Sequence, residues 1–93
     1  MHAVLVLCGD GQLLARGFDR GDAARAYFSE VSGAVLSTTA VRIENEVREL
    51  RFGWLVEVDG ADSPETAAAA ARAGQGAILA STIEPDGTGG RSG

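Results

Sequence analysis

The segment GAVLSTT at residues 33–39 is nearly repeated as GAILAST at residues 76–82. The two copies align without a gap when the chain is shifted against itself, and the same shift places Asp19 on Asp62. Self-similarity at a fixed spacing is typical of a duplicated structural unit, so it constrains the fold more than any single element does. The sequence therefore predicts two equivalent helix–strand units, at residues 19–39 and 62–82.

Each predicted unit begins with a helix whose ends are marked. In the first unit, Asp22 is suited to cap the N-terminus, and Gly33 stands where a helix C-terminus favours a left-handed residue. In the second unit, Ser63 and Pro64 form a start signal, and Gly74 ends the helix. Between the marks of the first unit, apolar residues recur at the spacing of one helix face: Ala24, Tyr27, Phe28 and Val31. The segments GAVLSTT and GAILAST then follow as predicted strands.

Two further segments have strand patterns. Residues 50–58 alternate between large apolar and mostly polar side chains, which predicts a half-buried strand. Residues 3–8 are apolar without alternation, which is typical of a central strand. The apolar phase changes across Glu44–Glu46, so we expect a turn there that joins Val35–Ile43 and Val47–Asp59 as a hairpin.

The segment Gly9-Asp10-Gly11 interrupts the first apolar run and leaves two alternatives open. A hairpin that turns at Asp10-Gly11 would add a strand at Gln12–Arg16. A bulge would instead keep one long strand. The residues themselves do not decide between the two.

The predicted order of elements is strand, helix, strand, strand, helix, strand in one α+β domain at residues 1–85. With right-handed crossovers, this order gives the ferredoxin-like, or split βαβ, arrangement, with both helices on one face of an antiparallel sheet. The strands that start at Ala3 and Leu50 would lie in the centre of the sheet. Residues 35–43 and 77–83 would form its edges.

The stretch FGWLVEVDGADSPETAAAAARAGQGAILASTIEP, residues 52–85, is similar to the C-terminal half of GYD-type and related small dimeric α/β-barrel domains. The shared pattern is a strand, an acidic turn, an Ala-rich helix and a final edge strand. The resemblance implies a ferredoxin-like fold and a dimer. Because the chain has Phe52-Gly53-Trp54 where the family is named for Gly-Tyr-Asp, no functional residue of the family is carried over.

Composition excludes several classes of function. The formal net charge of −5 argues against proteins that bind nucleic acids or anionic membranes by neutralising phosphates. The single Cys rules out an internal disulfide framework. The apolar start is short and follows no basic residue, unlike a signal peptide, so we expect a cytoplasmic protein. The basic residues are all Arg, which with the many Ala and Gly fits a GC-rich bacterial genome, and the Gly-rich tail at residues 86–93 is predicted to be disordered.

No set of side chains in the sequence has the composition of a catalytic site. His2 is the only His, and Cys8 would lie about 20 Å from it along a strand. Asp59, Asp62 and Glu65 are close in sequence, but they surround a predicted helix start, where acidic residues are expected. We therefore predict no catalytic residue, no metal site and no cofactor.

Several apolar and aromatic residues are candidates for a ligand or partner surface. Two Ala-rich helices give thin cover to the sheet face that bears Phe52 and Trp54. The predicted edge strand with Val35 and Val41 has no charge in its first seven residues. Tyr27 lies on the apolar stripe of the first helix.

These residues favour a small non-enzymatic domain that forms a homodimer, by edge pairing or by stacking of sheet faces, and that binds a small ligand or a protein partner. The alternative is an enzyme or ligand-binding protein of the dimeric α/β-barrel type, with an apolar pocket near Trp54. The sequence names no substrate and no pathway.

Overall fold

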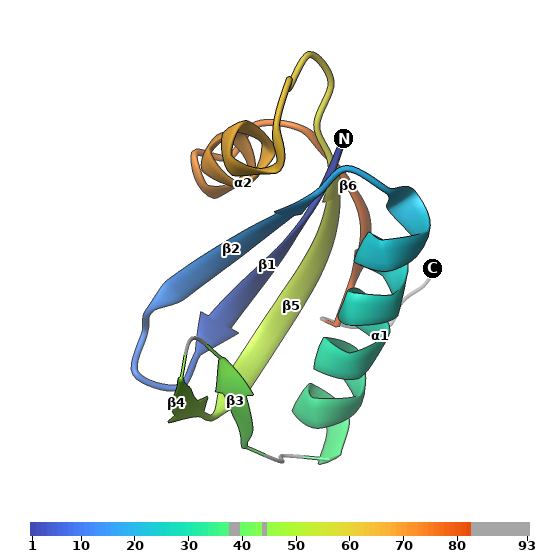
Figure 1. Cartoon of the computed structure of the whole chain (residues 1–93). Helices are drawn as coiled ribbons and strands as arrows, with labels where there is room; N and C mark the ends of the chain where they lie inside the picture. Colours follow the sequence, from blue (N-terminus) through green and yellow to red (C-terminus); the bar gives the residue numbers. More distant parts are fainter. Residues whose placement is uncertain (38–39, 44, 83–93) are drawn as a thin grey trace, which may run out of the picture.

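The computed structural model describes residues 1–37, 40–43 and 45–82, and it has the predicted α+β class (Figure 1). A four-stranded sheet has the order β2-β1-β5-β6, and β3 and β4 form a separate two-stranded sheet. The elements are β1 (His2–Cys8), β2 (Leu13–Phe18), α1 (Gly21–Ser37), β3 (Val41–Ile43), β4 (Glu46–Arg48), β5 (Leu50–Glu57), α2 (Pro64–Arg72) and β6 (Ala77–Ser81).

The central strands of the sheet are β1 and β5, as their sequences predicted. Each pair of neighbouring strands is antiparallel, and Leu5 of β1 pairs with Ala15 of β2 on one side and with Trp54 of β5 on the other. The predicted edge at the second repeat copy is confirmed as β6, but the other edge is β2 rather than residues 35–43. The ferredoxin-like topology is therefore not confirmed.

The Gly9–Gly11 segment is the turn of a hairpin, which decides between the two alternatives that the sequence left open. The N–H of Cys8 donates a hydrogen bond to the carbonyl oxygen of Gln12 at 2.9 Å. Gly11 has a φ of +89°, a conformation that glycine adopts without strain. The second strand of the hairpin, β2, extends to Phe18.

The strand predicted at Val35–Ile43 is confirmed only at its end, where Val41–Ile43 form β3, and Val35–Ser37 are helical instead. Helix α1 continues through Gly33 to Ser37, whose hydroxyl donates a hydrogen bond to the Gly33 carbonyl oxygen at 2.8 Å. The helix does not stop at Gly33 because its apolar face continues past it. Val31 and Ala34 are both buried against the sheet from that face.

The second copy of the repeat does form a strand, β6. Gly74 and Gly76 adopt positive φ values of +89° and +95°, which end the helical conformation before the strand begins. The same letters thus take different structures because the glycines before them differ in conformation. The predicted equivalence of residues 19–39 and 62–82 is wrong.

A short hairpin stands in place of the long one that was predicted. Strands β3 and β4 have three residues each and pair across a turn in which Asn45 has a φ of +66°. The predicted strand at residues 47–59 is divided, since β4 ends before β5 starts at Leu50. The predicted disordered tail at residues 86–93 lies outside the described residues.

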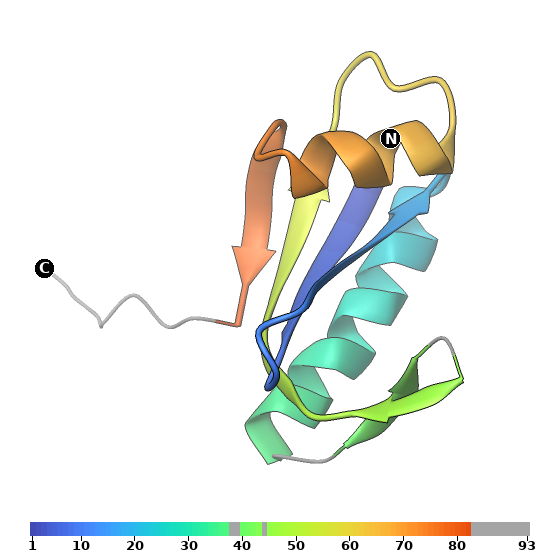
Figure 2. The same ribbon diagram turned by 90° about the vertical axis from the view of Figure 1, so that its left-hand side faces the viewer.

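The two helices cover opposite faces of the sheet, contrary to the predicted single face (Figure 2). Alternate residues of β1 divide between two cores. Val4 and Val6 belong to the core with α1, whereas Ala3 packs with Ala67 and Ala71 of α2. A strand buried on both faces has a continuous apolar sequence, so the missing alternation in β1 is the signal for this arrangement.

Glycines allow both helices to approach the sheet closely. A Cβ atom placed on Gly17 of β2 would lie 1.8 Å from the carbonyl oxygen of Pro64, at the start of α2. A Cβ atom on Gly53 of β5 would lie 2.7 Å from Cγ1 of Val31 in α1. The distance of each helix from the sheet therefore depends on the absence of a side chain at one strand position.

Replacing Gly17 by Ala should destabilise the fold, because the new methyl group meets backbone atoms of Pro64, which cannot rotate away. We expect a loss of about 1–3 kcal/mol in the free energy of unfolding, measured by urea denaturation with Trp54 fluorescence as the signal. A Gly17→Ala variant as stable as the parent protein would contradict the close approach of α2 to β2.

The matched control is Gly33→Ala. Gly33 lies inside α1, and no atom comes within 4 Å of an added Cβ. Ala should therefore raise the free energy of unfolding by about 0.5–1 kcal/mol. Destabilisation by this substitution would instead support the predicted helix end at Gly33.

Candidate functional site

Two of the predicted interface residues, Phe52 and Trp54, lie on the face of β5 that α2 covers in part. Their ring centroids are 6.2 Å apart, and both side chains are half-buried. Trp54 packs at the margin of the core formed with α2, whereas Phe52 belongs to neither core. The core between α2 and this face of the sheet therefore extends to Trp54 but not to Phe52.

Strand register arranges this face in three rows, which α2 covers unequally. From α2 outward, the rows are Gly17–Ala3–Val56, Ala15–Leu5–Trp54 and Leu13–Leu7–Phe52. Ala3 and Val56 of the first row are buried under α2, whereas the last row belongs to neither core. The Arg72 guanidinium of α2 still reaches the last row, where it donates a hydrogen bond to the carbonyl oxygen of Leu13. Among the described elements, only α2 lies on this side of the sheet (Figure 2). We call the least covered set the open face. Its members are all half-buried: Leu5, Leu7, Leu13, Phe52 and Trp54.

The edge strand β6 is a second apolar surface. It carries no charged residue, and Ile78 and Leu79 are 65% and 42% exposed. The register with β5 shifts between Leu55 and Val56, which marks a bulge in the pairing. A bulge makes an edge strand a poorer template for pairing with another chain.

A cavity of about 410 Å³ lies on the opposite side of the sheet, between α1, β2 and the β3–β4 hairpin. Val4 and Val6 line it from β1, Tyr27 and Val31 from α1, and Val41 from β3. The predicted ligand residues Tyr27 and Val41, which are far apart in the sequence, are brought together here. The walls are mainly apolar, as in most small-molecule sites.

Three charged side chains also line this cavity: Arg16, Arg42 and Glu30. The guanidinium carbon of Arg16 lies 5.1 Å from the ring centroid of Tyr27 and 5.3 Å from that of Phe18, so the group stacks on aromatic faces. In the part of the chain that the structure describes, neither arginine forms an ion pair. Among the described lining residues, positive side chains therefore outnumber negative ones by two to one.

The predicted candidates do not form one site. Phe52 and Trp54 belong to the open face, while Tyr27 and Val41 line the cavity on the other side of the sheet. Val35 is part of α1 and packs against the core on that side. A pocket was predicted near Trp54, but Trp54 does not line the cavity.

The residues considered for other chemistry stay apart. His2 and Cys8 stand at opposite ends of β1, and Cys8 is buried. No group of three or more His, Cys, Asp or Glu side chains is placed to hold a metal ion within residues 1–37, 40–43 and 45–82. None of the helices in these ranges is both long and apolar enough to cross a membrane.

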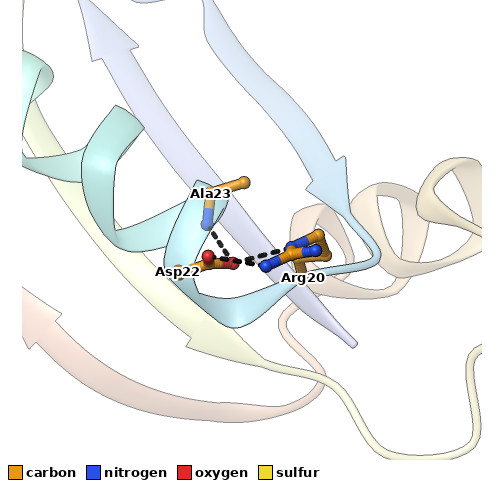
Figure 3. Close-up of polar contacts among 3 residues, drawn as sticks. All are labelled: Arg20, Asp22 and Ala23. Carbon is orange, nitrogen blue, oxygen red and sulfur yellow. Dashed lines mark hydrogen bonds and ion pairs between the residues drawn. The ribbon is translucent and has the colours of Figure 1, made fainter.

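The start of α1 carries a local ion pair. Asp22, predicted as the helix cap, lies in the first turn of α1, which begins at Gly21. Its carboxylate accepts hydrogen bonds from the Arg20 guanidinium at 2.9 and 3.0 Å and from the backbone N–H of Ala23 at 2.9 Å (Figure 3). The hydrogen bonds from Arg20 are the main cause that holds the pKa of Asp22 below its usual value.

Comparison of the chain with protein-family models, with curated proteins and with solved structures finds no match in any of the three. The resemblance to GYD-type domains therefore stays a prediction.

Replacing Arg20 by Gln should raise the pKa of Asp22 toward its usual value, because the charged hydrogen bonds are lost. The pKa is measured by NMR titration of the Asp22 carboxyl carbon. Because the pKa is depressed in the folded state, Asp22 contributes stability above its unfolded pKa, and this is lost as the pH falls through the folded pKa. The contribution is small, since both side chains are exposed to solvent.

The control for this titration is Arg51→Gln, an exposed arginine of β5 outside the helix, which should leave the pKa of Asp22 where it is. An unchanged Asp22 pKa in Arg20→Gln would show that the ion pair is absent in solution.

Proposed function

We propose that this chain is a small non-enzymatic domain that self-associates as a homodimer through its open face and binds a small ligand or a protein partner. The observation that supports self-association most strongly is the outer row of the open face. Leu7, Leu13 and Phe52 lie side by side on three strands and belong to neither core. Contiguous apolar patches of this kind commonly mark protein interfaces.

A second copy of the chain is the partner whose chemistry matches this face. The chain as a whole carries a net charge of −5, but every member of the open face is uncharged and apolar. The complementary surface must therefore be apolar too. A two-fold contact uses the same patch on both subunits, and two sheet faces pack about 10 Å apart with interdigitated side chains. Such a contact would remove Phe52 and Trp54 of both copies from water.

Stacking of faces is favoured over pairing of edges. Residues 35–43 do not form an edge of the four-stranded sheet, because Val35–Ser37 are helical and Val41–Ile43 belong to the separate two-stranded sheet. The edges of the four-stranded sheet are β2 and β6, and β6 has five residues and an irregular register with β5. Because Ile78 of β6 is an exposed apolar residue, pairing of β6 edges is the competing arrangement, and the experiment must distinguish it from stacking of faces.

The enzyme alternative from the sequence would need an apolar pocket beside Trp54. The cavity lies on the other face of the sheet, lined by Tyr27 and Val41. A ligand-binding role is therefore supported at the cavity rather than at the aromatic pair of the open face.

The dimer is tested by light scattering at micromolar concentration, where the parent protein should give about twice the 9.5 kDa mass of one chain. Phe52→Glu should give the mass of one chain, because a charge would be buried without a partner in the stacked interface. Far-UV circular dichroism checks that the variant is folded, and Leu13→Gln offers a milder change on the same face.

Two matched controls place the same charge on exposed apolar residues elsewhere. Leu36→Glu, at a position 74% exposed on α1, should leave the dimer intact, and so should Ile78→Glu on the β6 edge. Dissociation by Ile78→Glu alone would identify edge pairing as the contact. A parent protein that has the mass of one chain would overturn the dimer.

A further inference from the structure

We propose that the cavity between α1, β2 and the β3–β4 hairpin binds an amphipathic monoanion, with its apolar body against the valines of the cavity and its carboxylate or sulfonate on Arg16. This inference names a ligand class for the ligand-binding part of the proposed function and rests on that part alone. It does not depend on the homodimer, which uses the opposite face of the sheet.

The size and walls of the cavity fit an apolar body. Its volume of about 410 Å³ lies in the range of known ligand pockets, and at about 30 Å³ for each water-sized group it has room for roughly ten to fourteen non-hydrogen atoms. Val4, Val6 and Val31 offer no hydrogen bonds, and an ordered water needs two to four polar partners. An apolar chain or ring gains contacts at these walls that water cannot make.

The charge at the cavity favours an anion. Arg16 and Arg42 outnumber Glu30, the only acidic residue among the described lining residues. A local excess of positive charge runs against the net charge of −5 of the whole chain, so it is not a consequence of composition. Charge complementarity therefore selects a ligand with one negative group rather than a cation or a neutral molecule.

Arg16 is the residue best prepared to hold that group. Its guanidinium carbon lies over the rings of Phe18 and Tyr27, at 5.3 and 5.1 Å from the ring centroids, and this cation–π contact favours that position of the side chain. A guanidinium carries five N–H donors in a fixed fork. No hydrogen bond or ion pair within the described residues occupies these N–H groups. They are therefore available for a bidentate contact with a carboxylate.

The test titrates the full chain with decanoate and with decan-1-ol, which have about twelve and eleven non-hydrogen atoms and so match the cavity. Binding is followed by the NMR methyl signals of Val31, Val41 and Ile43, which line the cavity. Both compounds should move these signals, and decanoate should bind about tenfold more tightly than decan-1-ol because its charge is paired. Equal affinities would overturn the assignment of an anion.

Variants separate the charge from the apolar walls. Arg16→Gln should weaken decanoate about tenfold and leave decan-1-ol unchanged. The matched control Arg25→Gln, an arginine on the exposed side of α1 that does not line the cavity, should change neither. Val41→Phe narrows the cavity and should weaken both compounds. A loss of decanoate binding in Arg25→Gln equal to that in Arg16→Gln would mean that only overall charge matters.

The remaining outcomes also decide the proposal. Decylammonium, a cation of the same length, should bind more weakly than decan-1-ol, and tighter binding would show that Glu30 governs the site instead. Decanoate that moves the Leu7 and Leu13 signals without moving those of Val31 would place the contact on the open face and overturn the cavity site. If the protein binds decanoate but has the mass of one chain, the homodimer is overturned and the cavity site is supported. If the protein is a dimer but binds no decanoate, the cavity site is overturned and the homodimer is supported.

Discussion

Burial of β1 on both of its faces is the constraint on which the rest of the structure depends. Its even-numbered residues need cover from one side and its odd-numbered residues from the other, so the helices must divide between the two faces. They do so unequally. Helix α2 has nine residues and covers one end of its face, while α1 lies mainly against β5 and leaves space over β2 that the β3–β4 hairpin partly encloses. The open face and the cavity are both consequences of this uneven cover.

The parts of the fold that could be predicted are those set by neighbouring residues. Ser63 caps α2 by accepting a hydrogen bond from Thr66 N, as its position before Pro64 predicts. The repeat led to a wrong prediction because it compares only short segments, whose structure also depends on contacts with the rest of the chain. Gly33 can continue a helix or end one, and which occurs depends on whether the residues after it find a sheet to pack against. That information is not contained in the segment that carries the glycine.

The candidate surfaces, like the fold, could be predicted only where neighbouring residues in one element determine them. Alternation along one strand places Phe52 and Trp54 on a shared face, so the sequence identified them together. Arg16 was missed, although it lies two residues from both Leu14 and Phe18 in β2 and so shares their side of the sheet. The cavity could not be predicted at all, because its described lining residues come from five elements whose contact is decided by tertiary packing.

The cavity and the open face share strand β1 but lie on opposite sides of it. Val4 and Val6 line the cavity, and Leu5 and Leu7, the residues that alternate with them, belong to the open face. A ligand can shift an association equilibrium only by the difference between its affinities for the monomer and the dimer. In the proposed dimer, the side chains that a cavity ligand touches would keep their partners, because β1 is held in register on both sides by β2 and β5. The central sheet would then keep the cavity in one geometry in the monomer and in the proposed dimer, so filling it should leave the dimer affinity unchanged.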